Sequence, residues 1–81
     1  MALTRQELRD FLATKTRADL SKVGDDDELF SSGVIDSFAM VDLLTFLEKY
    51  TKTRLGFEDI DMDNVDSVSG ILRFAASKTK Q

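Results

Sequence analysis

The chain contains no cysteine and no histidine, two residue types on which much protein chemistry depends. Without cysteine it can form neither disulfides nor thiolate metal sites, and this absence fits a reducing compartment. Without histidine it lacks the usual base for a serine nucleophile. Proline is absent too, and only four glycines are present, which suits one compact domain over residues 1–81. We therefore expect a protein without catalytic residues of its own.

Basic charge is also scarce, since 11 basic residues face 15 acidic ones and the net charge is −4. Nucleic acids and anionic membranes both require a basic patch, so a basic protein surface is the better partner. No apolar run reaches the length of about eighteen residues that a membrane span needs, and the amphipathic segment Met1–Lys15 does not resemble a signal peptide. The expected location is the cytoplasm.

A chain this short buries only around 60–65% of its unfolded surface, which leaves few residues for a deep active site. Its stability should be modest, at roughly 4–12 kcal/mol. Small size therefore favours a binding or carrying module, and a monomer is expected.

A capping box predicts where the first helix begins. Thr4 is the cap and Glu7 lies three residues on, with Leu3 and Leu8 as a hydrophobic staple. An apolar stripe follows at helical spacing, formed by Leu8, Phe11 and Leu12. This pattern predicts a helix over about 4–16.

The next segment, Arg17–Asp36, loses the helical period but is too apolar for a free linker. Its apolar members are Leu20, Val23, Leu29, Phe30, Val34 and Ile35. We expect a long packed loop with a helical turn at Asp27–Phe30. A connection of about twenty residues is unusual in a compact domain and indicates a functional loop.

Asp36 is expected to cap a second helix over 37–51. One broad face of this helix should enter the core, namely Ala39, Met40, Leu43, Leu44, Phe46, Leu47 and Tyr50. The stripe could line a pocket for a cargo, although close packing is the preferred interpretation. Phe38 and Val41 fall on the opposite side and should be exposed. Their polar neighbours are Asp42, Thr45, Glu48 and Lys49.

The acidic stretch Glu58–Asp66 predicts a short third helix over about 59–64, and Asp66 or Ser67 should cap a last helix over 67–77. The buried stripe of that helix comprises Val68, Ile71, Leu72, Phe74 and Ala75, while Lys78 and Lys80 suit the negative end of its dipole. The tail 78–81 should fray. The expected fold class is all-α, a four-helix bundle with three main helices and a long first loop.

Three aspartates of the acidic stretch, Asp59, Asp61 and Asp63, have the spacing of a calcium loop. The rest of that motif fails, because Asn64 stands where glycine is needed and Gly70 replaces the bidentate carboxylate. We interpret these residues, like the run Asp25–Glu28, as loop carboxylates that cap helices. No metal site is expected.

Ser37 lies where the second helix should begin, with no base that could activate it. A phosphate on its hydroxyl would suit this position, because free backbone N–H groups and the helix dipole favour anions there. Phe38 and Val41 would then form an apolar landing patch beside the modified group. Asp42 and Glu48 would rim that patch.

The stretch FSSGVIDSF, Phe30–Phe38, closely resembles the attachment site of acyl carrier proteins, whose core motif is Asp-Ser-Leu. The likeness covers nearly the whole chain, since that family has a first helix, a long apolar loop, a motif-bearing second helix, a short third helix and a fourth. The resemblance implies a carrier, not an enzyme.

By this resemblance, a phosphopantetheinyl transferase would move 4′-phosphopantetheine from coenzyme A onto Ser37, with Asp36 assisting. The terminal thiol of the group would carry an acyl or aminoacyl thioester between partner enzymes. Those enzymes would dock on the second helix, at Phe38, Val41, Asp42, Thr45 and Glu48.

Three features differ from housekeeping fatty-acid carriers: Phe38 replaces the common leucine, Gly33 is separated from Asp36 by an additional residue, and Lys49 stands where glutamate is usual. They favour free-standing carriers that serve an adenylating ligase, such as D-alanyl, aminoacyl or secondary-metabolite carriers, over fatty-acid synthesis. The residues also leave open an unmodified helical adaptor that docks through Phe38 and Val41. Only the fate of the Ser37 hydroxyl separates the adaptor from the carrier.

Overall fold

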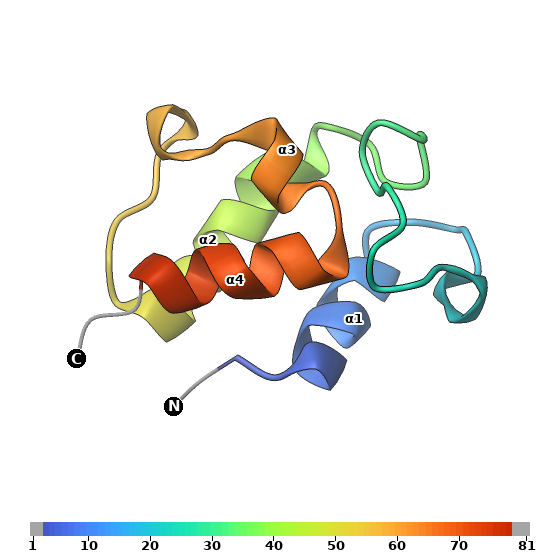
Figure 1. Ribbon diagram of the computed structural model, residues 1–81, viewed down its shortest axis with the longest axis horizontal. Coiled ribbons are helices and arrows are strands. Elements are labelled where there is room, and N and C mark those ends of the chain that lie inside the picture. The colour runs from blue at the N-terminus through green and yellow to red at the C-terminus, as the bar shows by residue number, and fades with distance from the viewer. Residues whose placement is uncertain (1–2, 79–81) are drawn as a thin grey trace.

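The computed structural model describes residues 3–78, and within them the chain forms helices and no strand. The helices are α1 (Arg5–Ala13), α2 (Ala39–Thr51), α3 (Met62–Val65) and α4 (Val68–Lys78), with short 3₁₀ helices at Leu20–Lys22 and Phe57–Asp59. Figure 1 shows α4 crossing in front of α2, with α3 on one side of α4 and α1 on the other. The expected all-α fold class is confirmed.

The core draws on all four of these helices and on the segments before and after α2. Its buried members are Leu8, Leu12, Leu29, Ile35, Met40, Leu43, Leu44, Leu47, Leu55, Val65, Val68, Ile71, Phe74 and Ala75. Phe46 of α2 is half-buried and stacks on Phe11 of α1, with ring centroids 4.1 Å apart. The apolar stripe of α2 is therefore closely packed. Close packing was the preferred interpretation of this stripe, and a cargo pocket was the alternative.

The capping box that opens α1 forms as expected. Thr4 Oγ1 accepts from the Glu7 N–H at 3.1 Å, and the Thr4 N–H donates to Glu7 Oε1 at 3.0 Å. The helix ends at Ala13, earlier than predicted, because the N–H groups of Thr14 and Lys15 donate to carbonyls three residues back instead of four. Such bonds tighten the last turn and stop the α-helix.

The loop between α1 and α2 packs against the core as expected, with Leu29 and Ile35 buried. Its helical turn lies at Leu20–Lys22, so the prediction of a turn at Asp27–Phe30 was wrong. The turn forms at Leu20–Lys22 because the Asp19 carboxylate accepts from the Ser21 N–H at 3.0 Å and caps it.

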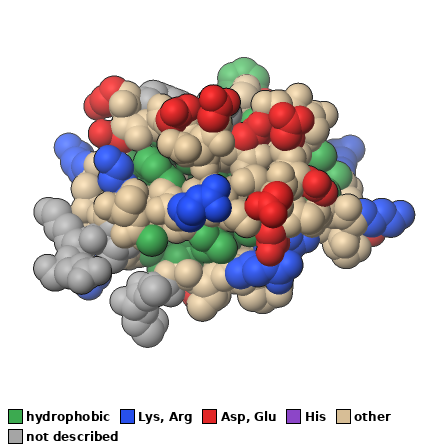
Figure 2. Space-filling model, viewed as in Figure 1, with side chains coloured by type: hydrophobic (Ala, Val, Ile, Leu, Met, Phe, Trp, Pro, Cys, Tyr) green, Lys and Arg blue, Asp and Glu red, His purple; other side chains and the backbone are tan. Residues whose placement is uncertain are grey.

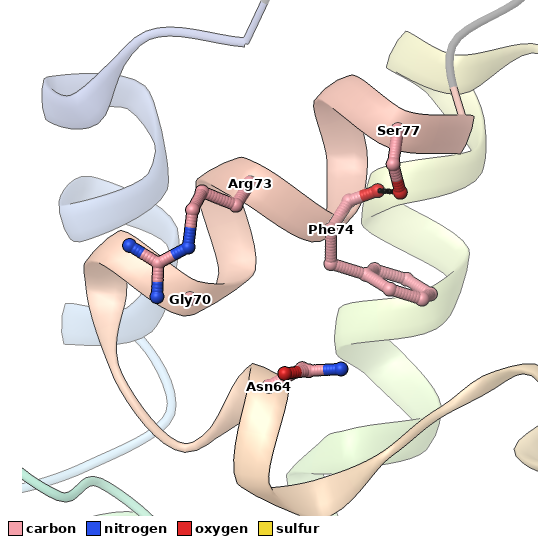
Figure 3. Close-up of a pocket in the computed structure, with 5 residues that line it drawn as sticks. All are labelled: Asn64, Gly70, Arg73, Phe74 and Ser77. Atoms are coloured by element: carbon pink, nitrogen blue, oxygen red, sulfur yellow. Dashed lines mark hydrogen bonds between the residues drawn. The ribbon is translucent and has the colours of Figure 1, made fainter.

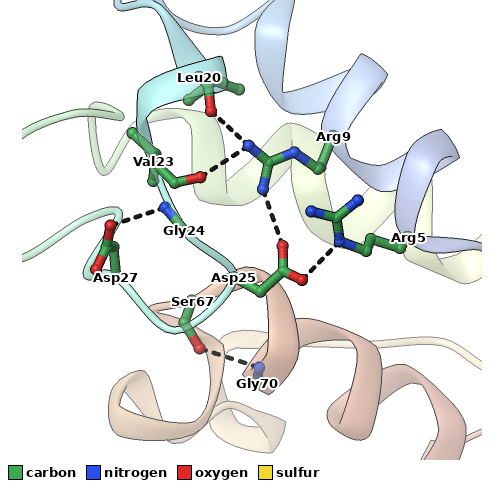
Figure 4. A network of polar contacts seen from close by, with 9 residues as sticks. All are labelled: Arg5, Arg9, Leu20, Val23, Gly24, Asp25, Asp27, Ser67 and Gly70. Atoms are coloured by element: carbon green, nitrogen blue, oxygen red, sulfur yellow. Dashed lines mark hydrogen bonds and ion pairs between the residues drawn. The ribbon is translucent and has the colours of Figure 1, made fainter.

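One residue in this loop, Asp25, ties it to two helices, and Figure 4 shows its carboxylate paired with Arg5 and Arg9 of α1. It pairs with Arg5 at 2.6 Å and with Arg9 at 2.9 Å, while the Asp25 carbonyl accepts from the Ser69 N–H of α4 at 2.9 Å. The hydrogen bond from Arg5, with the charges of both arginines, lowers the pKa of Asp25. Arg9 also donates to the carbonyls of Leu20 and Val23. Asp25, the first residue of the acidic run Asp25–Glu28, therefore fastens the loop to α1 and α4.

The aspartates of the second acidic stretch cap turns. Asp61 accepts from the Asp63 N–H at 3.1 Å at the start of α3, and Asp59 accepts from the Gly56 N–H at 3.0 Å. These bonds divide the predicted helix 59–64 into a 3₁₀ helix and a separate α3. Among the described residues no group of acidic side chains is arranged to hold a metal ion.

Helices α3 and α4 approach each other closely at Gly70. A Cβ atom at this position would lie 2.0 Å from the Asn64 carbonyl oxygen of α3. Ser67 caps α4, because its Oγ accepts from the Gly70 N–H at 3.0 Å (Figure 4). Of the two predicted caps, Ser67 therefore takes the position, and Asp66 is left for another role.

The end of α4 carries one of the two expected basic residues, Lys78, whose Nζ lies 5.9 Å from the centroid of the Phe74 ring. The helix includes Lys78, one residue beyond the predicted end, while Lys80 and the rest of the predicted frayed tail lie outside the described residues. Within residues 3–78, each helix is too short or too polar to span a bilayer.

Candidate functional site

Ser37 lies in an exposed turn directly before α2, at the end of the long loop that follows α1. The helix begins at Ala39, two residues later than predicted. The cause is a tighter turn in which the Asp36 carbonyl accepts from the Ala39 N–H at 2.9 Å and the Ser37 carbonyl from the Met40 N–H at 3.0 Å. Asp36 Oδ1 also accepts from the Phe38 N–H at 2.9 Å. The turn around Ser37 is thus held from both sides.

These bonds correct one expectation about the site. The N–H groups of Phe38, Ala39 and Met40 already have acceptors within the chain, so they are not free to hold a phosphate. What remains for an anion is the positive end of the α2 dipole. Within residues 3–78 the Ser37 hydroxyl has no hydrogen-bond partner, and it is therefore open to modification.

Two apolar side chains beside Ser37 face solvent, as expected. The Phe38 residue is 85% exposed and Val41 is 53% exposed, while the core-facing residues of α2 are buried. We call Phe38 and Val41 the α2 patch. Thr45, one turn after Val41, is also exposed, and its hydroxyl donates to the Val41 carbonyl at 3.2 Å.

The two predicted rim carboxylates already have partners inside the chain. Asp42 pairs with Lys15, two residues after the end of α1, at 2.9 Å, and Glu48 Oε2 accepts from the Leu55 N–H at 2.7 Å. Lys15 therefore brings a positive charge to the edge of the α2 patch, and Glu48 holds the segment after α2. The docking roles of Asp42, Thr45 and Glu48 stay predictions.

Asp66 is a residue whose role the sequence did not indicate. It lies between α3 and α4, is only 9% exposed, and reaches the loop before Ser37. Its Oδ1 accepts from the N–H groups of Leu29 at 3.2 Å, Phe30 at 2.6 Å and Ser31 at 3.0 Å. Burial alone would raise the pKa of this carboxyl, but the hydrogen bonds from Ser31, Phe30 and Leu29 outweigh burial and lower it.

Two hollows of the surface are lined by residues away from Ser37. One, of about 210 Å³, lies between α3 and α4 and is lined by Asn64, Gly70, Arg73, Phe74 and Ser77 (Figure 3). Another, of about 440 Å³, is lined by residues of α1 and of the loop that follows it. Acidic side chains gather on the edge of the molecule where α3 and the loop before it lie (Figure 2). None of the residues that line these two hollows belongs to the turn around Ser37.

Comparison with known proteins yields three findings. A protein-family model described as "Phosphopantetheine attachment site" matches residues 6–74. The chain is 32% identical over 63 residues to a D-alanyl carrier protein of Bacillus mycoides, covering 78% of this chain and 80% of that protein. It is 31% identical over 68 residues to a D-alanyl carrier protein of Bacillus velezensis, covering 84% of this chain and 87% of that protein. No solved structure shows a significant match.

Proposed function

Because the chain belongs to the family of carrier proteins with a phosphopantetheine attachment site, we propose that Ser37 is the residue that receives 4′-phosphopantetheine. When bound, the group supplies the terminal thiol, and with it the thioester chemistry, that this cysteine-free chain lacks. The observation that carries the proposal is the exposed Ser37 hydroxyl, which has no partner within residues 3–78 and lies at the start of α2.

The neighbouring serines support this choice by contrast. The Ser32 hydroxyl donates to the Glu28 carbonyl at 2.7 Å, and the Ser31 N–H donates to Asp66 Oδ1 at 3.0 Å. The Ser32 hydroxyl and the Ser31 backbone therefore hold the loop. The Ser37 hydroxyl has no such contact within residues 3–78, so it can be modified without breaking one.

The transfer step needs a base that this chain does not contain. The Ser37 oxygen forms the new bond to phosphorus, coenzyme A loses 3′,5′-adenosine bisphosphate, and the hydroxyl proton passes to a base of the transferase. Asp36 Oδ1 is engaged with the Phe38 N–H, while within residues 3–78 Asp36 Oδ2 accepts no hydrogen bond. This second oxygen is the part of Asp36 that would assist the transferase.

The α2 patch, Phe38 and Val41, is the proposed docking surface for partner enzymes. Exposed apolar side chains lose contact with water when a partner covers them, which favours association. The partners are a phosphopantetheinyl transferase and an adenylating ligase, which use coenzyme A and ATP. We therefore place the carrier in the cytoplasm, with no catalytic activity of its own.

The proposed cargo is D-alanine or another small amino acid, held as a thioester. Two similar proteins are named D-alanyl carrier proteins, and the match covers most of each chain. The turn that carries Ser37 and the α2 patch lies inside the matched region of the family model. A ligase that adenylates the amino acid would load the carrier.

The attachment is tested by intact mass after incubation with coenzyme A and a promiscuous phosphopantetheinyl transferase. The wild-type chain should gain the mass of one phosphopantetheine, and Ser37→Ala should gain none. Ser32→Ala is the matched control and should reach the same final mass as the wild type. An unmodified wild type, or a modified Ser37→Ala chain, would refute the proposed site.

The cargo is tested on the modified chain with an amino-acid-adenylating ligase, ATP and D-alanine. A second mass increase of one alanyl group, removed by hydroxylamine, is the expected result, because hydroxylamine cleaves thioesters. If instead the chain accepts fatty acyl groups from an acyl ligase and takes no amino acid, the proposed cargo is wrong.

A further inference from the structure

Asp66 connects the start of α4 to the turn around Ser37 through a short series of contacts. Its carboxylate holds the N–H groups of Leu29–Ser31, and its carbonyl accepts a second bond from the Leu29 N–H at 2.8 Å. The Leu29 carbonyl in turn accepts from the Ile35 N–H at 3.0 Å. Since Ile35 precedes Ser37 by two positions, the base of the loop that leads to Ser37 is fastened to Asp66.

The Leu29 N–H also has the Asp66 carbonyl, but the N–H groups of Phe30 and Ser31 have no acceptor other than the Asp66 carboxylate within residues 3–78. Leu29 and Ile35 are 0% and 1% exposed, so a backbone N–H beside them that lacked an acceptor would be costly to bury. An ionised carboxylate bonds to N–H donors about twice as strongly as a neutral acceptor does. Asp66 therefore holds three successive donors with one side chain, and the lowered pKa keeps that side chain ionised.

We infer that Asp66 is a positioning residue for the transfer of phosphopantetheine to Ser37, an inference that rests on the proposed function. Asp66 does not contact Ser37, so it acts through the loop. A hydroxyl that another enzyme must place in line with a phosphorus atom reacts well only from a narrow range of positions. Without the hydrogen bonds to the Asp66 carboxylate the loop could move, and the Ser37 hydroxyl would then leave the positions from which it reacts well.

The chain keeps other contacts that should let Asp66 variants fold. The Thr16 hydroxyl donates to the Val34 carbonyl at 2.5 Å, and the side chains of Leu29 and Ile35 stay in the core. The capping of α4 by Ser67 is also independent of the Asp66 carboxylate. The expected result of Asp66→Ala is a folded chain with a loosened loop base.

The test compares wild type, Asp66→Ala and Asp66→Asn as substrates of one phosphopantetheinyl transferase, at a temperature where circular dichroism shows each to be folded. For Asp66→Ala we expect kcat to fall by about tenfold or more, because misplacing a reacting group is costly. KM should stay within about twofold, since truncation leaves the α2 patch intact. Asp66→Asn keeps an acceptor oxygen and should recover most of the rate.

Amide hydrogen exchange gives the readout that separates local positioning from general stability. In Asp66→Ala the amides of Leu29–Ser31 and Ile35 should exchange faster, while those in the middle of α2 and α4 stay protected as in wild type. Phe74→Leu is the control, because it perturbs the core at α4 and removes none of the hydrogen bonds at the loop base. It should be modified at the wild-type rate.

Several results would overturn the inference. One is a folded Asp66→Ala chain modified at the wild-type kcat, and another is a Phe74→Leu chain slowed as much as Asp66→Ala. If Asp66→Ala does not fold, Asp66→Glu replaces it, because the added methylene displaces the carboxylate. An unchanged kcat in Asp66→Glu would then overturn the inference. A wild-type chain that is itself never modified would instead refute the proposed function.

Discussion

The Phe38 N–H donates to the Asp36 carboxylate at 2.9 Å, so this hydrogen bond closes over Ser37, the residue between them. Ser37 is thus flanked in the sequence by an acidic residue and by an aromatic residue whose side chain is exposed. The hydrogen bond also explains why α2 begins only at Ala39, since the backbone first completes a tighter turn. Ser37, the proposed attachment residue, is thus presented by a turn that its own neighbours hold.

This relationship predicts the effect of removing the Asp36 carboxylate. Asp36→Ala should lower the free energy of unfolding by about 1 kcal/mol, because the turn before α2 loses the acceptor for its N–H group. Asp36→Asn keeps an acceptor and should lower it less. Urea unfolding followed by circular dichroism measures both changes. Equal stability of Asp36→Ala and wild type would show that the turn does not need this bond.

The residue after α2 predicts a stabilising change. Lys52 has φ +55°, a left-handed conformation that glycine adopts without strain and a side chain with a Cβ does not. Glycine is also the usual residue at such a helix end. Lys52→Gly should therefore raise the free energy of unfolding by about 0.5–1 kcal/mol. A lower melting temperature for this variant would mean that the lysine side chain has a stabilising role of its own.

The close approach of α3 and α4 predicts a destabilising change. In Gly70→Ala the added Cβ would lie 2.0 Å from the Asn64 carbonyl oxygen, so the two helices must separate. Overpacking of this kind costs about 1–3 kcal/mol, which urea unfolding would detect.

Gly24→Ala is the control for that experiment. The nearest atom to its Cβ would be Asp27 Oδ2, 3.3 Å away on a flexible side chain, so the cost should be smaller. If Gly70→Ala proves as stable as wild type, α3 and α4 do not approach each other this closely at Gly70.

The local signals in the sequence predicted much of the fold and part of the site. The capping box at Thr4, the apolar stripes and the exposure of Phe38 all depend on residues within a few positions of one another. The spacing of apolar residues does not indicate the turn at Leu20–Lys22, because this turn depends on a polar cap, Asp19. Short-range patterns therefore identified the helices but placed one turn wrongly.

The contacts that were not predicted join side chains to distant backbone groups. Glu48 bonds to Leu55 and Asp66 bonds to Leu29–Ser31, across separations that no helical or capping pattern encodes. Asp66 also had a plausible local role as the cap of α4, which Ser67 takes instead. A charged residue with two possible partners cannot be assigned from sequence spacing alone, because only the packed loop decides between them.

Acid should weaken the fold through Asp66. Burial acts to raise the pKa of this carboxyl, but the hydrogen bonds from Ser31, Phe30 and Leu29 lower it below its usual value of 3.8. Because the folded pKa lies below the unfolded one, the bonded carboxylate stabilises the chain fully above the unfolded value, and this contribution is lost as the pH falls through the folded pKa. Wild type should therefore lose stability as the pH drops below about 4.

Asp66→Asn provides the comparison for this pH dependence, because its amide does not titrate. It should be less stable than wild type at neutral pH, and the difference should shrink in acid. Urea midpoints of both chains over a series of acidic pH values measure this. A difference that stays constant as the pH falls would mean that the Asp66 charge does not contribute.

The account depends on one hydroxyl, and tandem mass spectrometry of the chain after modification by a phosphopantetheinyl transferase tests it most directly. Fragments should place the phosphopantetheine on Ser37, with Ser31 and Ser32 unmodified, because those two residues hold the loop through the Ser31 N–H and the Ser32 hydroxyl. Fragments that place the group on any other residue, or a chain that carries no group at all, would contradict the account.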